Sequence, residues 1–279
     1  MPYLEVCPIG CSAAIEETSL ILPEGVLRRC TACGHLWSQC SEQQYWSSMS
    51  EFDDAQGTLP AAGAEDRSFR LGKKRLDMVV GTLGKAPQQI RLLDVGCSSG
   101  AFLQVARQLG FQAEGVEPAK QAAQTAQAAG FKVFQGLLQD ADFQDASFDA
   151  VTLFEVIEHI KASLSLLREC RRILKPDGVM IIGTGNTESW TVAAQGGRWE
   201  YFRIDQHGGH ISFFNPVSLR LAAERSGFKV VSIKTRGVRF YEKTDCSGLV
   251  YRLTKIAGEL LNVPARLAGK GHNLLAILR

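Results

Sequence analysis

From about residue 67 to its end, the chain alternates the patterns of amphipathic helices with those of short buried strands. Helical spacing of apolar residues is found at 67–83, 100–110, 119–130, 163–174 and 215–228. Strand patterns are found at 90–95, 112–117, 131–136, 148–154, 178–184, 229–235 and 272–279. Parallel strands need a crossover between them, and that crossover is usually a helix. The alternation therefore predicts an α/β fold with a mostly parallel sheet and helices on both faces.

Composition and charge narrow the class of protein. Apolar residues make up 45% of the chain and charged residues 22%, as in ordinary globular proteins. The first ten residues have no basic start or apolar core of the kind found in signal peptides, which predicts a cytoplasmic protein. Residues 1–45 are acidic, whereas ten Lys/Arg against three Asp/Glu follow residue 227. An anionic partner is therefore expected at the C-terminal end.

The turn after the strand at 90–95 reads "DVGCSSG" and indicates a ligand site. Gly96 and Gly100 let the backbone bend and approach a ligand closely. Asp94 would repel a pyrophosphate, and Glu117, at the end of the next strand, suits the two hydroxyls of a ribose. S-adenosylmethionine combines a ribose with cationic groups and carries no phosphate, so it fits this pattern.

Five segments, including the turn and the Glu117 strand end just described, agree in order and spacing with one family. They read "LLDVGCSSG", "GVEP", "SFDAVTLFEVIEHI", "RRILKPDGVMIIGTGN" and "GGHISFFNPVSLRLAAERSGF". Over roughly residues 86–235 and the closing strand, the chain resembles the class I S-adenosylmethionine-dependent methyltransferases. The resemblance implies a Rossmann-like sheet of seven strands in which 272–279 runs antiparallel.

The resemblance also implies a set of donor-binding residues. They are, in chain order, Asp94, Gly96, Gly100, Glu117, Leu137, Leu138 and Phe154. The first three match the loop under the methionine part and the ribose, and Glu117 matches the residue that binds the ribose. Leu137 and Leu138 match positions that face the adenine, and Phe154 matches a residue beside the donor. Plain core packing is the alternative for these last three.

Two clusters contain candidate catalytic groups. Glu155, Glu158 and His159 stand at i, i+3 and i+4, so they share one face if this stretch begins a helix. His159 would then serve as a general base, or the three residues would hold a divalent cation. The alternative is that they form the wall of the donor pocket and the start of a helix.

The second cluster, 199–214, is rich in aromatic and polar side chains, among them Tyr201, Arg203, His207 and His210. It follows the fifth strand, where the resemblance places the acceptor site. His210 matches a histidine of related quinone and glycan O-methyltransferases. We therefore expect His210 to be the base, with His159 as the second choice.

Five of the eight cysteines lie within residues 1–45. Cys7, Cys11, Cys30 and Cys33 form a C-x3-C and a C-x2-C-G pair, which predicts a zinc-ribbon-like module with one structural zinc. His35 or Cys40 would be the substitute ligands, and free cysteines in a small lobe are the alternative. Cys97, Cys170 and Cys246 are predicted to be core or loop residues.

Zinc together with a methyltransferase domain leaves two classes of substrate. We expect O-methylation of a small-molecule, glycan or lipid-linked acceptor, because the N-terminal module is acidic and a nucleic-acid-binding module is normally basic. The alternatives are methylation of a base in ribosomal RNA and a non-catalytic adaptor with a vestigial donor site.

Changes in residue composition and pattern divide the chain into a module at 1–45, a linker and helix at 46–85 and a methyltransferase domain at 86–279. Within 46–85, residues 46–66 are polar and interrupted by Gly and Pro, as linkers are. The domain contains an acceptor-site loop at 187–215 and a basic amphipathic insertion at 236–271. In the insertion, apolar residues recur at helical spacing from Leu249 to Leu261, flanked by Arg252 and Lys255. This helix is expected to pack on the domain or a second subunit, or to contact a membrane at 249–270.

Overall fold

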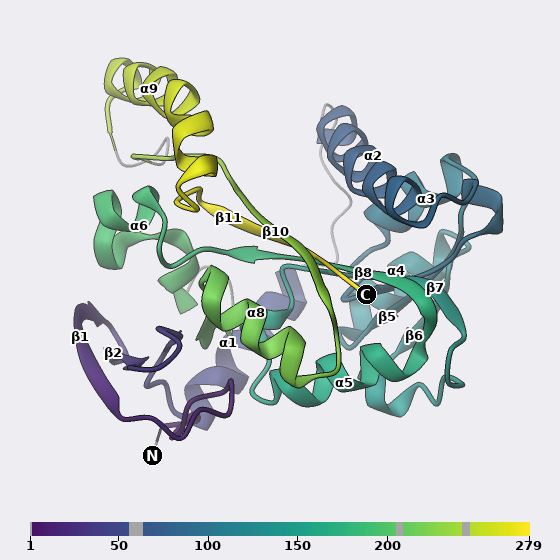
Figure 1. The fold of residues 1–279 in the computed structure, drawn as a ribbon, viewed down its shortest axis with the longest axis horizontal. Coiled ribbons are helices and arrows are strands. Elements are labelled where there is room, and N and C mark those ends of the chain that lie inside the picture. Colours follow the sequence, from purple (N-terminus) through teal and green to yellow (C-terminus); the bar gives the residue numbers. More distant parts are fainter. Residues whose placement is uncertain (1, 56–63, 205–208, 242–245) are drawn as a thin grey trace.

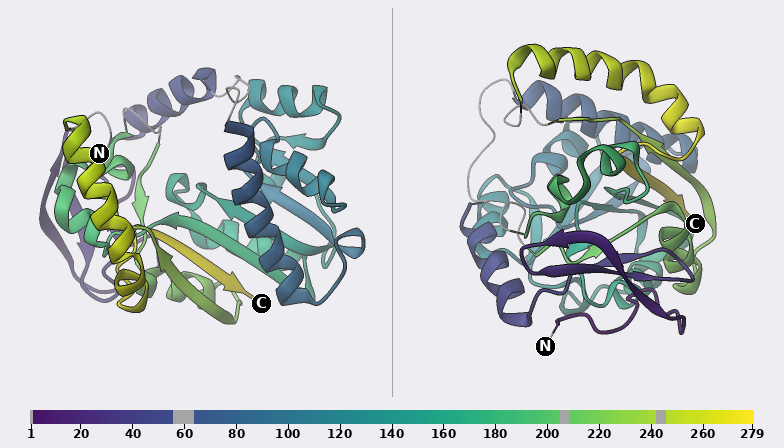
Figure 2. Two further views of the ribbon diagram at one scale, coloured as in Figure 1. Left: turned by 90° about the horizontal axis from the view of Figure 1, so that it is seen from above. Right: turned by 90° about the vertical axis from the view of Figure 1, so that its left-hand side faces the viewer.

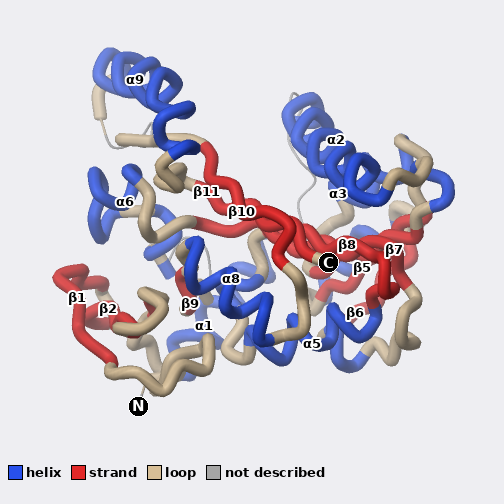
Figure 3. The backbone as a smooth tube through the Cα atoms, viewed as in Figure 1, coloured by secondary structure: helices blue, strands red, loops and turns tan. Residues whose placement is uncertain are grey.

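The computed structural model describes residues 2–55, 64–204, 209–241 and 246–279. Seven strands form one sheet in the order β10-β11-β8-β7-β4-β5-β6, seen as the long twisted band in Figure 3. They are β4 (Arg91–Val95), β5 (Gln112–Glu117), β6 (Lys132–Gln135), β7 (Phe148–Phe154), β8 (Leu174–Gly185), β10 (Val230–Arg236) and β11 (Asn273–Leu278). All pairings are parallel except those of β11, which is antiparallel to β8 and β10. The predicted fold and the antiparallel closing strand are confirmed.

Helices cover both faces of this sheet (Figure 1). They are α2 (Ala64–Leu83), α3 (Ala101–Gln108), α4 (Lys120–Ala128), α5 (Ser163–Ile173) and α8 (Pro216–Arg225). The helices α2 and α3 pack together on one face, while α5 and α8 pack together on the other. Local sequence explains where α8 starts: the Asn215 side chain accepts a hydrogen bond from the Ser218 amide at 2.8 Å, and a proline follows Asn215.

The order of the strands reverses beside β4, which lies between β7 and β5. In open α/β sheets, ligands bind outside the carboxyl ends of the strands at such a reversal. Asp94 lies near the end of β4 and Phe154 ends β7, so both predicted donor residues lie at this point.

A second, four-stranded sheet has the order β1-β2-β3-β9, with β1 (Ile15–Leu22), β2 (Gly25–Cys30), β3 (Leu36–Trp37) and β9 (Ser212–Phe213). Its last strand comes from the later part of the chain and pairs Leu36 with Phe213. His35 is fully buried and its Nε2 lies 2.9 Å from the Ser212 hydroxyl. The N-terminal residues are thus joined to the segment that follows His210.

Part of the expected linker is helical. Helix α1 (Glu42–Ala55) begins four residues before position 46, and 56–63 lie outside the described residues. Tertiary contacts explain the difference: the Tyr45 hydroxyl donates to the His159 carbonyl at 2.9 Å, and its ring stacks on Tyr3. A linker was predicted from local polarity, which does not reveal such contacts.

Two further helices follow β8 and β10. Helix α6 (Trp190–Gln195) begins the predicted acceptor-site loop, and α9 (Gly248–Leu267) makes up most of the predicted insertion. Figures 1 and 2 show α9 at the end of the sheet that carries β10 and β11, away from α2 and α3. Within the described residues, none of the helices has the length and apolar character needed to span a membrane.

Candidate active site

The glycine-rich turn between β4 and α3 leaves no room for side chains at its glycines. Gly96 has φ 77°, and a Cβ there would lie 2.3 Å from Val156 Cγ2. Gly100 has φ 88°, and a Cβ there would lie 3.0 Å from the Phe131 ring. Ser98 also takes a positive φ of 48°, so a serine occupies a conformation that favours glycine. The close approach of Gly96 to Val156 joins this turn to the 155–159 segment.

Glu117 is positioned by the backbone of that turn. Its Oε2 accepts a hydrogen bond from the Ser98 amide at 2.8 Å, and its Oε1 accepts one from the Ala119 amide at 2.9 Å. Only 7% of the residue is exposed. Bonds of this kind hold a carboxylate in one orientation, as binding of two vicinal hydroxyls requires.

Asp94 is almost entirely buried at the end of β4. The Thr152 hydroxyl, from the neighbouring strand β7, donates to its Oδ1 at 2.7 Å. Burial raises the pKa of Asp94 to about 7, although the Thr152 hydrogen bond and the charge of Arg75 act in the opposite direction. A cationic ligand beside Asp94 would favour the ionised carboxylate.

The apolar residues predicted to face the donor differ in their surroundings. Leu137 is 54% exposed just beyond β6, whereas Leu138 is buried in the hydrophobic core. Phe154 packs edge-to-face against Phe102 at 5.5 Å between ring centroids. Core packing thus describes Leu138 better than Leu137.

Sequence reasoning missed Arg75, which α2 places in this site. Its guanidinium carbon lies 3.8 Å from the centroid of the Phe154 ring. The charges of Glu155 and Asp94 raise the pKa of Arg75, while burial, the larger effect, lowers it. One sequence feature could have revealed Arg75: it is a basic residue beside the apolar Leu76, on the packed side of an amphipathic helix.

The segment after β7 is a single 3-10 turn, Ile157–His159, rather than the start of a helix. Glu155 precedes it with φ 56°, a left-handed conformation that is strained for a glutamate. Its side chain accepts a hydrogen bond from the Tyr201 hydroxyl. The expected shared helix face is therefore wrong. Glu155 contacts the 199–214 loop, while Glu158 and His159 are placed by the tight turn.

His210 lies against the other aromatic side chains of the site. Its ring stacks on Tyr201 with centroids 5.2 Å apart and meets His159 at 4.4 Å. Its Nδ1 lies 3.0 Å from the Tyr201 carbonyl oxygen. The loop therefore brings both predicted histidines together. His207, another residue of the predicted lining, lies outside the described residues.

Glu158 joins these histidines from the buried side. It is 1% exposed, and the Thr184 hydroxyl donates to its Oε2 at 3.0 Å. Burial, reinforced by the charge of Glu155, raises the pKa of Glu158 well above its usual value. Among the described residues, Glu158, His159 and His210 offer ligand atoms that all lie within 4.8 Å of one another. The cation set predicted from sequence thus contains His210 in place of Glu155.

Comparison with known proteins identifies this arrangement. Residues 66–233 match a family described as a methyltransferase domain, and the match covers more than half of the chain. The chain belongs to this methyltransferase family. The donor turn, Glu117 and the 155–159 segment all lie within the matched residues.

Among relatives of this methyltransferase is a ubiquinone biosynthesis O-methyltransferase of Xanthomonas oryzae pv. oryzae (strain PXO99A). It is 32% identical over 133 residues, which are 45% of this chain and 55% of the relative. A ubiquinone biosynthesis O-methyltransferase of Maricaulis maris (strain MCS10) is 32% identical over 162 residues, 54% of this chain and 63% of the relative. The methyltransferase thus spans little more than half the length of the first curated relatives it matches.

Solved structures share its fold. A SAM-dependent methyltransferase from Archaeoglobus fulgidus has a TM-score of 0.52 and 20% identity, covering 75% of this chain and 93% of the other. A geranyl diphosphate C-methyltransferase from Streptomyces coelicolor A3(2) has a TM-score of 0.54 and 16% identity, covering 83% of this chain and 97% of the other. At these identities the likeness establishes the fold.

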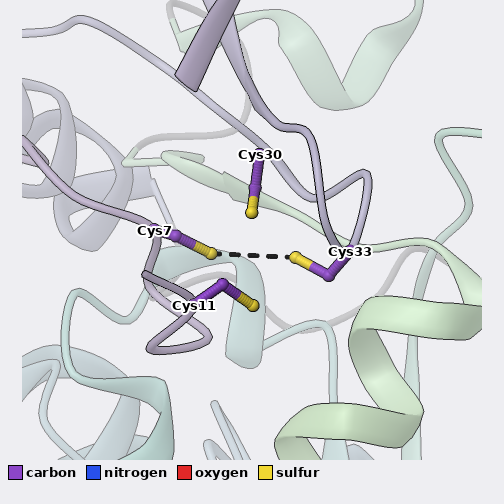
Figure 4. Close-up of side chains that lie close together, drawn as sticks. All are labelled: Cys7, Cys11, Cys30 and Cys33. Carbon is purple, nitrogen blue, oxygen red and sulfur yellow. Dashed lines mark hydrogen bonds between the residues drawn. The ribbon is translucent and has the colours of Figure 1, made fainter. Parts of the chain in front are cut away.

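The methyltransferase also carries a four-cysteine cluster outside the matched residues. The sulfurs of Cys7, Cys11, Cys30 and Cys33 lie within 4.8 Å of one another and converge in Figure 4. The Cys7 and Cys33 sulfurs are 3.7 Å apart. Four thiolates at about 2.3 Å from a tetrahedral zinc are about 3.8 Å from each other, so the residues fit zinc.

Neither substitute zinc ligand belongs to this cluster. His35 is fully buried among Ser212, Ser218 and Phe214, and burial lowers its pKa to about 3. Cys40 is buried and stands apart from the four grouped sulfurs. Cys97 and Cys170 are buried, as expected of core residues.

Proposed function

We propose that this methyltransferase transfers a methyl group from S-adenosylmethionine to a hydroxyl oxygen of a small-molecule, glycan or lipid-linked acceptor. The observation that carries the proposal is the hydrogen bond between His210 Nδ1 and the Tyr201 carbonyl. A carbonyl oxygen only accepts, so Nδ1 carries a proton. The lone pair of the neutral imidazole is then on Nε2, the nitrogen suited to accept a proton from a hydroxyl.

The donor is proposed to lie over the glycine turn. Glu117 binds the two ribose hydroxyls, because its carboxylate is held by two backbone amides. Leu137, exposed just after β6, provides apolar surface for the adenine. Asp94 faces the cationic part of the donor, and Arg75 binds its carboxylate. These four assignments place each donor group beside a side chain of complementary character.

The reaction is a displacement at the methyl carbon. The hydroxyl oxygen forms a bond to this carbon while the bond from carbon to sulfur breaks, and the sulfonium becomes a neutral thioether. The hydroxyl proton passes to His210 Nε2 and leaves to solvent. The donor is already activated, so the protein mainly aligns the reacting atoms and provides the base.

A divalent cation held by Glu158, His159 and His210 is a second candidate for activating the acceptor. Carboxylate oxygen and imidazole nitrogen suit such cations, and the three ligand atoms lie close together. A cation bound there would lower the pKa of an acceptor hydroxyl. The carbonyl of Tyr201 would then orient His210 as a second partner, as is common for metal-bound histidines.

A small acceptor is favoured over RNA by the character of the loop and of the N-terminal module. The Tyr201 ring stacks on His210 with centroids 5.2 Å apart, an aromatic surrounding suited to an acceptor with a ring or an apolar chain. Residues 1–45 contain five acids against two arginines, and this net negative charge would disfavour binding of a phosphate backbone. The relatives named for ubiquinone biosynthesis support an O-methylated small molecule.

We assign the N-terminal residues 1–45 to a zinc-ribbon-like module whose single zinc is structural. Four thiolates complete a tetrahedral shell and leave no position for a reacting group. Arg225 of α8 donates to Cys11 Sγ at 3.4 Å, and the Asn215 side chain donates to the Cys33 carbonyl at 3.0 Å. The zinc would therefore also stabilise the contact between the module and α8.

Two measurements test this proposal in sequence. Calorimetry should detect S-adenosylmethionine binding that falls by about tenfold or more in Glu117→Ala, because two charged hydrogen bonds are lost. The control is Glu114→Gln, on the same strand but paired with Arg91 and Lys132. Binding that is equal in the wild type and Glu117→Ala would contradict the donor site.

The second measurement follows a labelled methyl group into cell extracts that are separated into small-molecule, lipid, glycan and RNA fractions. We expect the labelled methyl group in the small-molecule, lipid or glycan fraction. It should remain attached in alkali, since an aryl or alkyl ether resists alkali. Label in RNA would instead support the ribosomal alternative. Donor binding with no transfer into any fraction would support a non-catalytic adaptor.

A further inference from the structure

Helix α9 exposes an unusual concentration of large apolar side chains. Of the sixteen exposed large apolar residues among the described positions, seven lie on this one helix. They are Leu249, Val250, Leu253, Ile256, Leu260, Val263 and Leu267, with exposed fractions from 40% to 80%. The stripe from Leu249 to Leu261 was expected to pack on the domain or a second subunit, or to contact a membrane, and the exposure of most of its residues contradicts packing on the domain. Only Ala257 and Leu261 are partly buried.

A different face of α9 packs on the domain. Gly258 and Ala265 are buried, and a Cβ at Gly258 would lie 2.4 Å from the Val238 carbonyl oxygen. With 100° per residue, these two small residues lie nearly opposite Ile256 and Leu260. The helix is thus fixed by its small residues, and this fixed orientation directs its apolar face into solvent.

The exposed apolar face is wide and has basic residues along one side. On a helical wheel, the seven exposed apolar residues lie within an arc of about 140°, with Val263 at one edge of the arc and Val250 at the other. Arg252, Lys255 and Arg266 follow one edge of this face, with Glu259 as the single acid among them. None of the three cations is ion-paired within the described part of the chain. A wide apolar face with a cationic edge is typical of helices that lie in a membrane interface.

The C-terminal end of α9 is joined to the acceptor-site loop. The Asn186 side chain donates to the carbonyls of Gly269 and Gly271, at 3.1 and 2.7 Å, just after the helix. The Trp190 amide donates to the Lys270 carbonyl at 2.9 Å. Asn186 follows the carboxyl end of β8, so α9 lies at the same edge of the sheet as the candidate active site.

We propose that α9 binds the surface of an anionic membrane, lying in the plane of the interface with its apolar face toward the acyl chains. Three cations attract the negatively charged headgroups, and the apolar side chains supply the insertion. This binding stands independently of catalysis. Its consequence, that the active site opens toward a lipid-borne acceptor, rests on the proposed function.

A second copy of the chain fits this face less well. An antiparallel pairing of two α9 helices that brings Leu249 opposite Leu267 and Ile256 opposite Leu260 places Val250 opposite Arg266 of the other copy. Arg252 then lies near Arg266 of the other copy, and the two Glu259 side chains face each other. Like charges at such positions destabilise a helix pair. An anionic surface instead complements the net positive charge.

The proposal is tested by co-sedimentation of the full chain, without donor or acceptor, with two kinds of vesicle. One is pure phosphatidylcholine, and the other contains equal parts of phosphatidylcholine and phosphatidylglycerol. We expect binding to the anionic vesicles alone, and we expect it to weaken with added salt. The variant Arg252→Gln/Lys255→Gln/Arg266→Gln should bind these vesicles on the order of a hundredfold more weakly.

Apolar insertion is tested by Leu253→Glu/Ile256→Glu, which should abolish sedimentation with the anionic vesicles. The matched control is Ile21→Glu/Val217→Glu, two exposed apolar residues on β1 and α8, which should bind as the wild type does. Donor binding by calorimetry reports folding separately, so failed donor binding and failed membrane binding are distinguished.

Three outcomes would overturn the proposal. The first is equal binding to neutral and anionic vesicles, and the second is equal loss of binding in the control variant. The third is absence of binding to the anionic vesicles. If a dimer is then seen in light scattering and Leu253→Glu/Ile256→Glu dissociates it, α9 is a subunit interface instead.

Discussion

His210 Nδ1 lies 3.0 Å from the carbonyl oxygen of Tyr201, nine residues earlier in the same loop. This contact selects the tautomer of His210 and thereby makes Nε2 the basic nitrogen. The Tyr201 ring also stacks on the imidazole, and its hydroxyl donates to Glu155. Tyr201 thus links the segment after β7 to the base that we assign in the acceptor loop.

Replacing His210 should affect turnover far more than donor binding. We expect His210→Ala to lower kcat by about 10²-fold or more, because the base is lost, while the Kd for S-adenosylmethionine changes little. Initial-rate kinetics with the acceptor and calorimetry with the donor measure the two effects. His159→Ala serves as the comparison, and a larger loss of kcat in that variant would make His159 the base instead.

Donor affinity should rise with pH between 6 and 8 because of Asp94. Burial raises the pKa of Asp94 to about 7, so the carboxyl is mostly neutral at pH 6 and mostly ionised at pH 8. If the cationic donor binds the ionised form, its affinity increases by about tenfold over this range. Calorimetry at several pH values measures this change. The difference between wild type and Asp94→Asn isolates the contribution of the carboxyl, and equal slopes would exclude Asp94 from the donor site.

The raised pKa of Asp94 has the opposite effect on the free energy of unfolding of the donor-free protein, which should fall as the pH rises. The buried neutral form is favoured, so the contribution of Asp94 is fully present below pH about 4 and is lost as pH rises to about 7. Urea unfolding of the donor-free protein should show this decline relative to Asp94→Asn. A difference between the two proteins that stays constant with pH would contradict it.

Arg75 should contribute to donor affinity although it lies outside the glycine turn. We expect Arg75→Ala to weaken S-adenosylmethionine binding by about tenfold, because one charged hydrogen-bonding group facing the donor is removed. Lys74→Ala is the matched control, since Lys74 is an exposed cation next to Arg75 on α2. Equal weakening of binding in both variants would show that the loss of one positive charge, rather than a specific contact of Arg75, lowers the affinity.

Metal removal should destabilise the N-terminal module and its junction with α8. Purified protein should contain about one equivalent of zinc by elemental analysis, and Cys30→Ser should lose it and lower the Tm. Cys246→Ser, whose sulfur lies outside the cluster, should retain the metal. Wild-type protein that is free of metal and yet resists proteolysis at residues 1–45 would show that the module needs no zinc.

Local patterns were sufficient to predict the regular elements and to single out the glycine turn that we assign to the donor. A buried strand followed by Gly96 and Gly100, and an acid ending the next strand, specify a ligand crevice because the carboxyl ends of parallel strands meet at one edge. Glu117 was therefore predicted to bind the ribose from its position at the end of β5 alone. The cysteine pairs were recognised for a similar reason, since thiolates two or three residues apart share one turn.

Contacts between distant segments were decided only by the tertiary structure. Arg75 lies beside Phe154 because α2 packs its inner face on the sheet. Leu137 and Leu138 differ because Leu137 precedes the 3-10 turn Leu138–Asp140, whereas Leu138 begins that turn and is buried by it. His210 replaces Glu155 in the cluster around Glu158 because the loop after α6 folds back over a 3-10 turn. In α9 the periodicity was plain from the sequence. Which face meets the domain was decided by Gly258 and Ala265, because only small residues allow the helix backbone to approach Val238 closely.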